Sequence, residues 1–180
     1  MQKNKISVVT GVAGTIGSNL ANALIKLGHI VYGIDDFSLG KRKNLDLLKK
    51  NKKFKLIKCD VSNYKQLKKN IFLKKKINYL WLLAANSDIQ AGIRDRNVDL
   101  VKTFMTTKIS SDFFSKYLFK NSKIIFSSSS AVYGNIKKKI NENIKLFNPI
   151  SNYGEAKLLS EIYLDDFSKK KKFEYLIIRF

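Results

Sequence analysis

The chain has 180 residues, a formal net charge of +21 and 44% apolar residues. This length suits one domain with a sizeable core, and the apolar content excludes wholesale disorder. No apolar run approaches the roughly 18 residues that a membrane-spanning helix needs. The single cysteine, Cys59, excludes an internal disulfide framework, so the composition indicates a cytoplasmic protein with a buried thiol.

A strand, a glycine-rich turn and a helix open the chain. Residues 5–10 form a short β-branched run, which is typical of a buried parallel strand. The next helix has a core-facing stripe at positions 16, 20, 23, 24 and 27. Between them, glycines with the spacing G-x-x-G-x-x-G permit a tight turn and a close backbone approach to a pyrophosphate. We assign phosphate binding to Gly11, Gly14, Thr15, Ile16 and Gly17.

The second strand, residues 29–35, ends in a carboxylate. Asp35 lies 18 residues after Gly17, where an acid accepts hydrogen bonds from the adenosine ribose and repels a 2′-phosphate. This position favours NAD over NADP, and we assign the adjacent Asp36 to the same cofactor. The basic residues 41–43 partly offset that preference, and residues 43–50 are predicted to form a short helix.

The third and fourth strands, residues 54–59 and 79–85, flank a helix predicted over residues 64–73. Asp60 directly follows the third strand, where it can accept a hydrogen bond from the adenine amino group. An equally good interpretation is that Asp60 caps the next helix.

A long helix is predicted over residues 98–120, with apolar side chains around most of its circumference. A helix that is apolar on nearly all sides is usually buried on nearly all sides. The helix predicted over residues 152–168 is similar, so we expect the two helices to pair with their copies in a two-fold homodimer. The alternative is that further chain covers them.

The fifth strand, residues 123–128, runs into a row of serines. We accept a flexible turn as the interpretation of three of them and assign only Ser129 to catalysis, as a donor to the reacting oxygen. Tyr153 and Lys157 lie four residues apart on one face of the next helix. A phenol is a poor base at neutral pH, but we expect Lys157 and an oxidised nicotinamide to lower its pKa, so that Tyr153 accepts a proton from a sugar or alcohol hydroxyl.

With a sixth strand at residues 173–179, the alternation of strands and helices predicts an α/β fold: a doubly wound parallel sheet of six strands with helices on both faces. Ligands bind such sheets at the carboxyl ends of the strands. The chemically suggestive segments all follow strand ends, so we expect them to share one site.

These residues resemble the NAD-dependent nucleotide-sugar epimerases and dehydratases, within the extended short-chain dehydrogenase/reductases. The matching motifs are Thr10-Gly-Val-Ala-Gly-Thr-Ile-Gly17, Asp35-Asp-Phe-Ser-Leu-Gly40, Cys59-Asp-Val61, Leu83-Ala-Ala-Asn-Ser-Asp88, Phe126-Ser-Ser-Ser-Ser-Ala-Val-Tyr-Gly134 and Tyr153-Gly-Glu-Ala-Lys157. The resemblance implies a Rossmann-type domain with a catalytic triad of Ser129, Tyr153 and Lys157. It also implies that Val61, Ala84 and Ala85 line the cofactor path. A nucleotide-diphosphate sugar is then expected beside Ser87, Asp88, Ser129 and Ser130.

Two departures from the family pattern bear on function. Thr103 stands where the family usually has an asparagine, and Ser130 and Ala131 stand where sugar dehydratases carry Asp-Glu. Without that acid, the triad moves only a hydride and a proton, which favours a 4-epimerase of the UDP-galactose type. The alternatives are a dehydratase or reductase of the same family, and a dinucleotide-binding module without catalysis.

Relatives continue beyond the sixth strand into a part that supplies most of the sugar pocket. We therefore expect residues 1–180 to be an NAD-binding domain that lacks most of the substrate region. The chain alone should bind NAD weakly and show little or no turnover.

The high positive charge is explained by base composition, without a functional role. Only four of the 35 basic residues are arginine, the residue preferred for bidentate phosphate and base recognition. Lysine, isoleucine and asparagine share AT-rich codons, so base composition alone raises all three. Most lysine clusters fall between a helix end and the next strand, at the amino edge of the sheet, so we expect neither a nucleic acid nor a membrane as partner. A weak polyanion contact at that edge remains the alternative.

Overall fold

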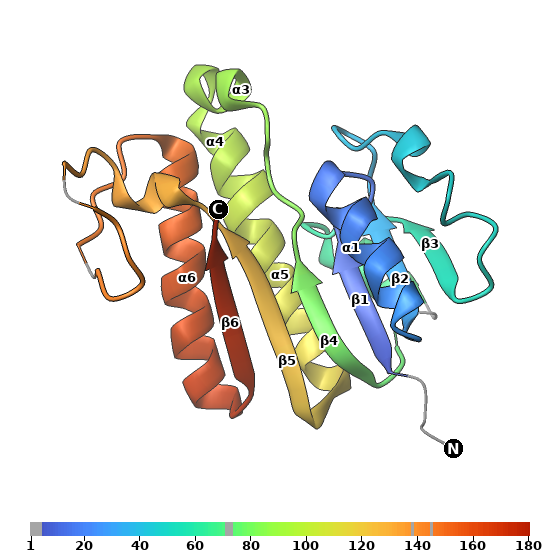
Figure 1. Ribbon diagram of the computed structural model, residues 1–180. Helices are drawn as coiled ribbons and strands as arrows, with labels where there is room; N and C mark the ends of the chain where they lie inside the picture. Colours follow the sequence, from blue (N-terminus) through green and yellow to red (C-terminus); the bar gives the residue numbers. More distant parts are fainter. Residues whose placement is uncertain (1–4, 71–73, 138, 145) are drawn as a thin grey trace.

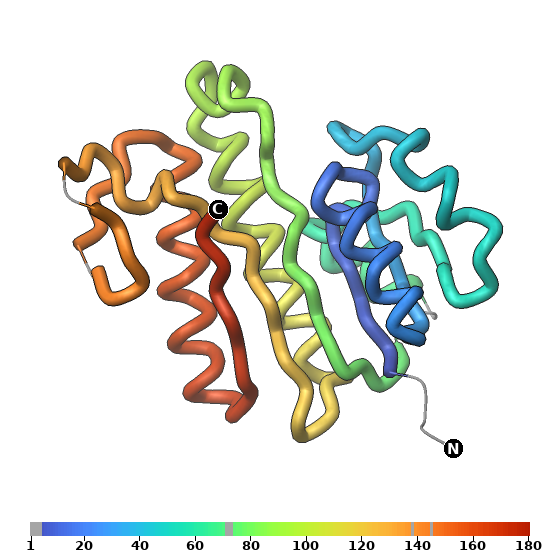
Figure 2. Tube along the Cα trace, viewed as in Figure 1, coloured from blue at the N-terminus to red at the C-terminus, as the bar shows by residue number. Residues whose placement is uncertain are grey.

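Figures 1 and 2 show a computed structural model of the chain, which describes residues 5–70, 74–137, 139–144 and 146–180. The strands are β1 (Ile6–Thr10), β2 (Ile30–Asp35), β3 (Phe54–Lys58), β4 (Ile77–Leu82), β5 (Leu118–Ser128) and β6 (Glu174–Arg179). The α-helices are α1 (Thr15–Lys26), α2 (Tyr64–Lys69), α3 (Ile89–Arg94), α4 (Arg96–Asp99), α5 (Thr106–Phe114) and α6 (Asn152–Lys171). Short 3₁₀ turns are η1 (Arg42–Leu45), η4 (Ser115–Tyr117) and η5 (Ser130–Tyr133), and a π-helical segment, η3 (Leu100–Met105), joins α4 to α5.

The six strands form one parallel sheet in the order β3-β2-β1-β4-β5-β6. The chain winds outward from β1 in one direction and from β4 in the other, so the order reverses between β1 and β4. The predicted doubly wound sheet is confirmed. Its strands point toward the upper part of Figure 1, where their carboxyl ends meet, and this reversal is where such sheets bind ligands.

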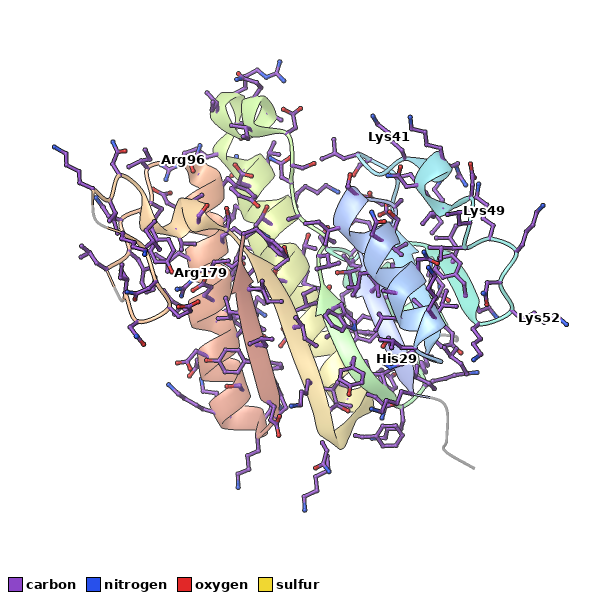
Figure 3. The ribbon with its side chains drawn as sticks, in the orientation of Figure 1. His29, Lys41, Lys49, Lys52, Arg96 and Arg179 are labelled. Atoms are coloured by element: carbon purple, nitrogen blue, oxygen red, sulfur yellow. The ribbon has the colours of Figure 1, made fainter. Side chains whose placement is uncertain are left out.

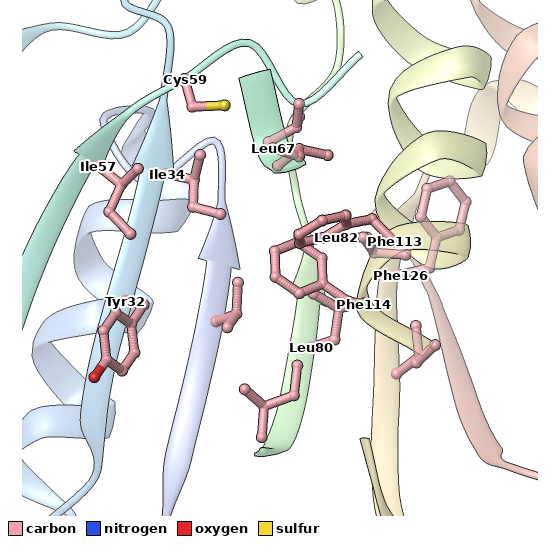
Figure 4. Packing of buried hydrophobic residues seen from close by; sticks show 14 of the residues in the cluster. Tyr32, Ile34, Ile57, Cys59, Leu67, Leu80, Leu82, Phe113, Phe114 and Phe126 are labelled. Carbon is pink, nitrogen blue, oxygen red and sulfur yellow. The ribbon is translucent and has the colours of Figure 1, made fainter. Parts of the chain in front are cut away.

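Both faces of the sheet centre are buried, which explains the continuous apolar run of β1. Val8 and Val9 are at most 1% exposed although they point to opposite faces. Val9 packs with α1 and the segment after η1, while Val8 belongs to the core beneath α2, α5 and α6. Figure 4 shows the centre of that second core, where Phe113 and Phe114 of α5 meet Phe126 of β5.

The predicted long helix of residues 98–120 is wrong at its end and in its regularity. The helical run contains the π-helical η3, and β5 begins at Leu118 instead of residue 123. Leu118 pairs with Ile77, and the Ser122 hydroxyl fixes the intervening bulge because it accepts from the N–H of Phe119 and donates to the carbonyl of Ile77. The apolar residues at 117–119 continue the pattern of the preceding helix, so periodicity alone did not reveal this change, and the first residues of β5 are mostly exposed.

Several other boundaries differ from the prediction, including the end of α6, which is Lys171 rather than residue 168. The helix expected at residues 43–50 is only the turn η1, because its two buried anchors, Leu45 and Leu48, are three residues apart and support a single turn. The fourth strand ends at Leu82 rather than residue 85, and helix α3, which was not predicted, begins soon after it. The helix expected over residues 64–73 ends at Lys69, and residues 71–73 lie outside the described residues.

Across the ranges that the structure describes, no helix is both long enough and apolar enough to cross a membrane.

Candidate functional site

A crevice of about 480 Å³ opens at the carboxyl ends of the strands. It brings together four of the predicted segments, with Ser127 from a fifth, whereas Ser129, Ser130, Tyr153 and Lys157 are not among the residues that line it. Among its lining residues are Gly11, Gly14, Thr15, Ile16, Gly17, Asp35, Asp36, Asp60, Val61, Ala84, Ala85, Ser87 and Asp88. The volume suits an extended small-molecule ligand.

The glycine loop forms one wall and leaves almost no space for side chains. Gly11 has a φ of +68°, and a Cβ there would lie 2.8 Å from the backbone nitrogen of Ala84. A Cβ on Gly17 would lie 2.3 Å from the carbonyl oxygen of Gly11. Gly14 is the N-cap of α1 and has no side chain with which to satisfy the first-turn N–H groups. The loop therefore presents a bare helix N-terminus to the crevice, an arrangement that favours anionic ligands.

Asp35 fastens this loop to the end of β2. Its carboxylate accepts hydrogen bonds of 2.8 Å from the N–H groups of Ala13 and Phe37, and the residue is 8% exposed. Burial raises the pKa of the Asp35 carboxyl above its usual value, against the lowering effect of these two bonds. The predicted ribose acceptor thus also holds the phosphate loop in place.

Asp36 and Asp60 both line the crevice, and Lys102 of η3 contacts both. The Lys102 ammonium lies 2.9 Å from Asp60 Oδ2 and 3.4 Å from Asp36 Oδ2. Burial alone would raise the pKa of Asp60, but hydrogen bonds from Ser62 and Lys102 outweigh it and lower the pKa. The alternative that Asp60 caps the next helix is wrong, because Asn63 is the N-cap of α2.

The segment after β4 is ordered by buried polar contacts. The backbone N–H of Asn86 donates to the Thr103 hydroxyl at 3.1 Å, and the Asn86 side chain donates to the Asp99 carboxylate at 2.9 Å. Thr103 therefore orders the site although it replaces the family's usual asparagine. The Asp88 carboxylate accepts from the N–H of Ala91 and caps α3, so one of its oxygens is already engaged.

The three proposed catalytic side chains meet where β5 ends. The Ser129 hydroxyl lies close enough to the Tyr153 phenol to lower the pKa of that phenol. The Lys157 ammonium lies 5.6 Å from the centre of the Tyr153 ring and donates to the carbonyl oxygen of Ser127 at 2.5 Å. Ser127 itself lines the crevice. Ser130 is exposed at the start of η5, and its N–H donates to the Phe180 carbonyl.

Burial shifts the pKa values of Tyr153 and Lys157 in opposite directions. It raises the pKa of the Tyr153 phenol above its usual value, and the negative charge of Asp99 adds to this, while the nearby Ser129 hydroxyl opposes it. Burial lowers the pKa of Lys157 to about 8, although Glu161 opposes the shift. In the chain by itself the Tyr153 pKa is therefore raised, so the predicted lowering depends on the positive charge of an oxidised nicotinamide in addition to Lys157.

The buried Lys157 gives the chain a pH-dependent stability. Because the folded-state pKa of Lys157, about 8, lies below the usual 10.5, Lys157 by itself raises the free energy of unfolding by about 3 kcal/mol between these pH values, while the raised pKa of Cys59 offsets part of this rise in the whole chain. Urea unfolding at both ends of the window measures this. We expect Lys157→Met to remove most of the rise, and an equal rise in the variant would contradict the assignment.

A buried ion pair that the sequence did not predict lies next to the three proposed catalytic side chains. Arg179, labelled in Figure 3, donates to both oxygens of Glu161 at 2.9 and 2.7 Å and to the Tyr133 hydroxyl at 2.8 Å. Glu161 is 5% exposed and also accepts from the hydroxyl of Ser128. The sequence feature that could have revealed this pair is the carboxylate of Glu161 among the apolar residues of helix 152–168, because a carboxylate in such a place is typical of a buried ion pair.

Comparisons with known proteins agree with this geometry. The chain is 29% identical over 164 residues to a UDP-glucuronate 4-epimerase of Thermodesulfobacterium geofontis, an alignment that covers 86% of this chain and 49% of that protein. The structure of a UDP-glucose 4-epimerase from Thermotoga maritima, solved with UDP-glucose, superposes with a TM-score of 0.85 at 30% identity, covering 97% of this chain and 54% of that one. A UDP-glucose 4-epimerase from Brucella ovis in complex with NAD has the same fold, with a TM-score of 0.80 at 22% identity, covering 97% of this chain and 51% of that one.

The chain spans about half the length of the curated relatives it matches. A protein-family model described as GDP-mannose 4,6 dehydratase matches residues 8–180, which is nearly the whole chain. With the six-stranded sheet, the glycine crevice and the epimerase relatives, this match leads to one conclusion: the chain belongs to the family of nucleotide-sugar epimerases and dehydratases.

Proposed function

We propose that residues 1–180 form the NAD-binding, catalytic part of a nucleotide-sugar 4-epimerase. The observation that carries this proposal is that Ser129, Tyr153 and Lys157 lie together at the end of β5, next to Ser127, which lines the same crevice as the glycine loop. The glycine loop is tightly packed, because a Cβ at Gly11 or Gly17 would collide with backbone, and it leaves the N-terminus of α1 open to the crevice. Its uncapped helix N-terminus also matches a pyrophosphate.

Each part of NAD has residues suited to it. The N–H groups of Thr15, Ile16 and Gly17 are expected to bind the pyrophosphate, and Asp35, with Asp36 beside it, the adenosine ribose. The adenine is expected beside Asp60 and Val61, and the nicotinamide end along Ala84 and Ala85 toward Tyr153. Bound NAD would supply a hydride acceptor that later returns the hydride.

The three catalytic side chains transfer the proton of the sugar hydroxyl. Tyr153 accepts the proton of the sugar 4-hydroxyl, Ser129 donates a hydrogen bond to the same oxygen, and Lys157 stabilises the ionised phenol. Loss of the 4-hydroxyl proton and of the C4 hydride would leave a transient 4-keto sugar; after it turns its other face to the cofactor, the hydride would return to C4 from the opposite side and Tyr153 would return the proton to the oxygen. Ser130 and Ala131 supply no carboxylate for removing water, which favours epimerisation over the dehydratase alternative.

The substrate class and the assembly are part of the same proposal. We expect a nucleotide-diphosphate sugar near Ser87 and Asp88, at the far end of the crevice. Leu100, Leu159 and Ile162 are 41–58% exposed on neighbouring helical segments, as expected for a homodimer formed through these helices. A monomer at micromolar concentration in light scattering would contradict that assembly. The cytoplasmic location of the protein stays a prediction.

A chimera tests the chemistry, because the chain spans only half of its relatives. Residues 1–180 would be joined to the C-terminal half of the Thermotoga epimerase, and UDP-glucose conversion would be followed by product analysis. We expect NAD-dependent formation of the 4-epimer, and a loss of roughly 100-fold or more in kcat for Tyr153→Phe. The control is Tyr163→Phe on the same helix, whose hydroxyl donates to Asp112.

Each unfavourable outcome of this assay has a distinct meaning. A 4-keto product that has lost water would favour the dehydratase alternative over the epimerase. Equal turnover by wild type and Tyr153→Phe would contradict the role given to Tyr153.

A further inference from the structure

Lys102 makes a contact that the chemistry proposed above does not use. Its ammonium bridges two carboxylates from different strands, Asp36 after β2 and Asp60 after β3. All three side chains are partly buried, with exposed fractions of 39%, 29% and 27%. All three also line the crevice. The bridge therefore lies within the cofactor crevice, at its adenosine end.

The π-helical turn aims Lys102 into this position. Within η3, Lys102 reaches the two carboxylates while its neighbour Thr103 accepts from the backbone of Asn86. Two consecutive residues thus serve the same crevice. Thr106 donates its hydroxyl hydrogen to the carbonyl of Val101, five residues earlier, which satisfies an acceptor of the wide turn. Such π-segments are frequent at functional sites.

The negative charges that border the crevice explain why a lysine between two carboxylates would help a dinucleotide to bind. Asp35, Asp36 and Asp60 all border it, and a dinucleotide must bring an anionic pyrophosphate close to them. The two Asp35 oxygens each accept a backbone N–H bond, whereas Asp36 and Asp60 share the Lys102 charge. Burial alone would lower the pKa of Lys102, but its bonds to Asp60 and Asp36 outweigh this and raise the pKa, so the ammonium stays charged at neutral pH.

We propose that Lys102 is a positioning residue for the adenosine half of NAD: it holds the Asp36 and Asp60 carboxylates in place and offsets their repulsion of the pyrophosphate. This inference rests on the proposed function. Lys102 acts through the two aspartates, so its loss should weaken every ligand that carries the adenosine and phosphate groups. It should affect such ligands equally whether or not they carry nicotinamide.

The test compares Lys102→Met with Lys108→Met. Lys108 lies one and a half turns further along the same helical run, is 40% exposed and pairs with Asp112 at 2.7 Å, so it is a matched charge. Calorimetric titrations with NAD and with ADP-ribose would be run at about 50 mM and about 300 mM salt. We expect Lys102→Met to bind both ligands roughly tenfold more weakly at low salt, with a smaller loss at high salt. Lys108→Met should bind like wild type, and Lys102→Arg should recover most of the loss.

Several outcomes would overturn the inference. Wild-type affinity in Lys102→Met, or an equal loss in Lys108→Met, would show that the bridge does not position the cofactor. A loss that salt leaves unchanged and Lys102→Arg fails to rescue would indicate a packing effect instead. If wild type itself binds neither NAD nor ADP-ribose, the proposed function fails and this inference with it, whereas the other outcomes contradict this inference alone.

Discussion

Replacing Gly14 by alanine is expected to abolish NAD binding while the chain stays folded. The backbone at Gly14, with φ −74° and ψ 168°, is open to any residue. A Cβ there would lie 3.3 Å from the Gly11 carbonyl oxygen, a tight contact that a shift of a few tenths of an ångström relieves. In the cofactor complex the same methyl group would stand between the helix N-terminus and the pyrophosphate, so we expect an affinity loss of roughly 100-fold or more.

Gly17, in the same loop, is expected to respond differently to the same substitution. A Cβ on Gly17 would lie 2.3 Å from the Gly11 carbonyl oxygen, so Gly17→Ala should lose both stability and binding. Gly14→Ala should change the free energy of unfolding by less than about 1 kcal/mol. Asn19→Ala, on the exposed side of α1, is the control for a new alanine in this helix. Calorimetry and urea unfolding measure both quantities, and normal NAD binding by Gly14→Ala would contradict the phosphate site.

Arg179→Met is expected to produce the largest loss of stability among single charge changes. The Arg179 and Glu161 side chains are 21% and 6% exposed, so removal of the guanidinium leaves a buried carboxylate without its cation. Such a loss costs about 3 kcal/mol or more. The guanidinium also lies 4.7 Å from the centre of the Phe147 ring, and that packing is lost as well.

An exposed pair at the same sheet edge is the control. Lys123 and Glu174 pair at 2.8 Å between β5 and β6, but their side chains are 52% and 67% exposed. Lys123→Met should cost less than about 1 kcal/mol. Adding Glu161→Gln to Arg179→Met should restore part of the stability, because the uncompensated charge is then gone. Similar losses for Lys123→Met and Arg179→Met in urea unfolding would contradict the buried-pair interpretation.

The sequence predicted the strands, the topology and most crevice residues, because these follow from local rules. Buried parallel strands are short apolar runs, and parallel topology places every strand's carboxyl end at one edge. The glycine loop, Asp35 and Asp60 could therefore be brought to one crevice before any coordinates were known. Tyr153 and Lys157 followed from their helical spacing together with their place at the start of the helix after the fifth strand.

The parts that the sequence did not predict depend on contacts between distant segments. The Lys102 bridge needs a π-turn and two strand ends, and none of these interactions is encoded within a few residues of Lys102. The Glu161–Arg179 pair joins residues on α6 and β6 through side-chain geometry. The start of β5 at Leu118 depends on Ile77, some forty residues earlier. Periodicity cannot reveal pairings of this kind.

A calorimetric titration of NAD into the wild-type chain tests the central claim most directly. Far-UV circular dichroism and cooperative urea unfolding would first establish that the chain is folded. We predict saturable binding of one NAD per chain, weaker binding of NADP because of Asp35, and none by Gly14→Ala. A folded chain that binds no NAD up to about 5 mM, or that prefers NADP, would contradict the account.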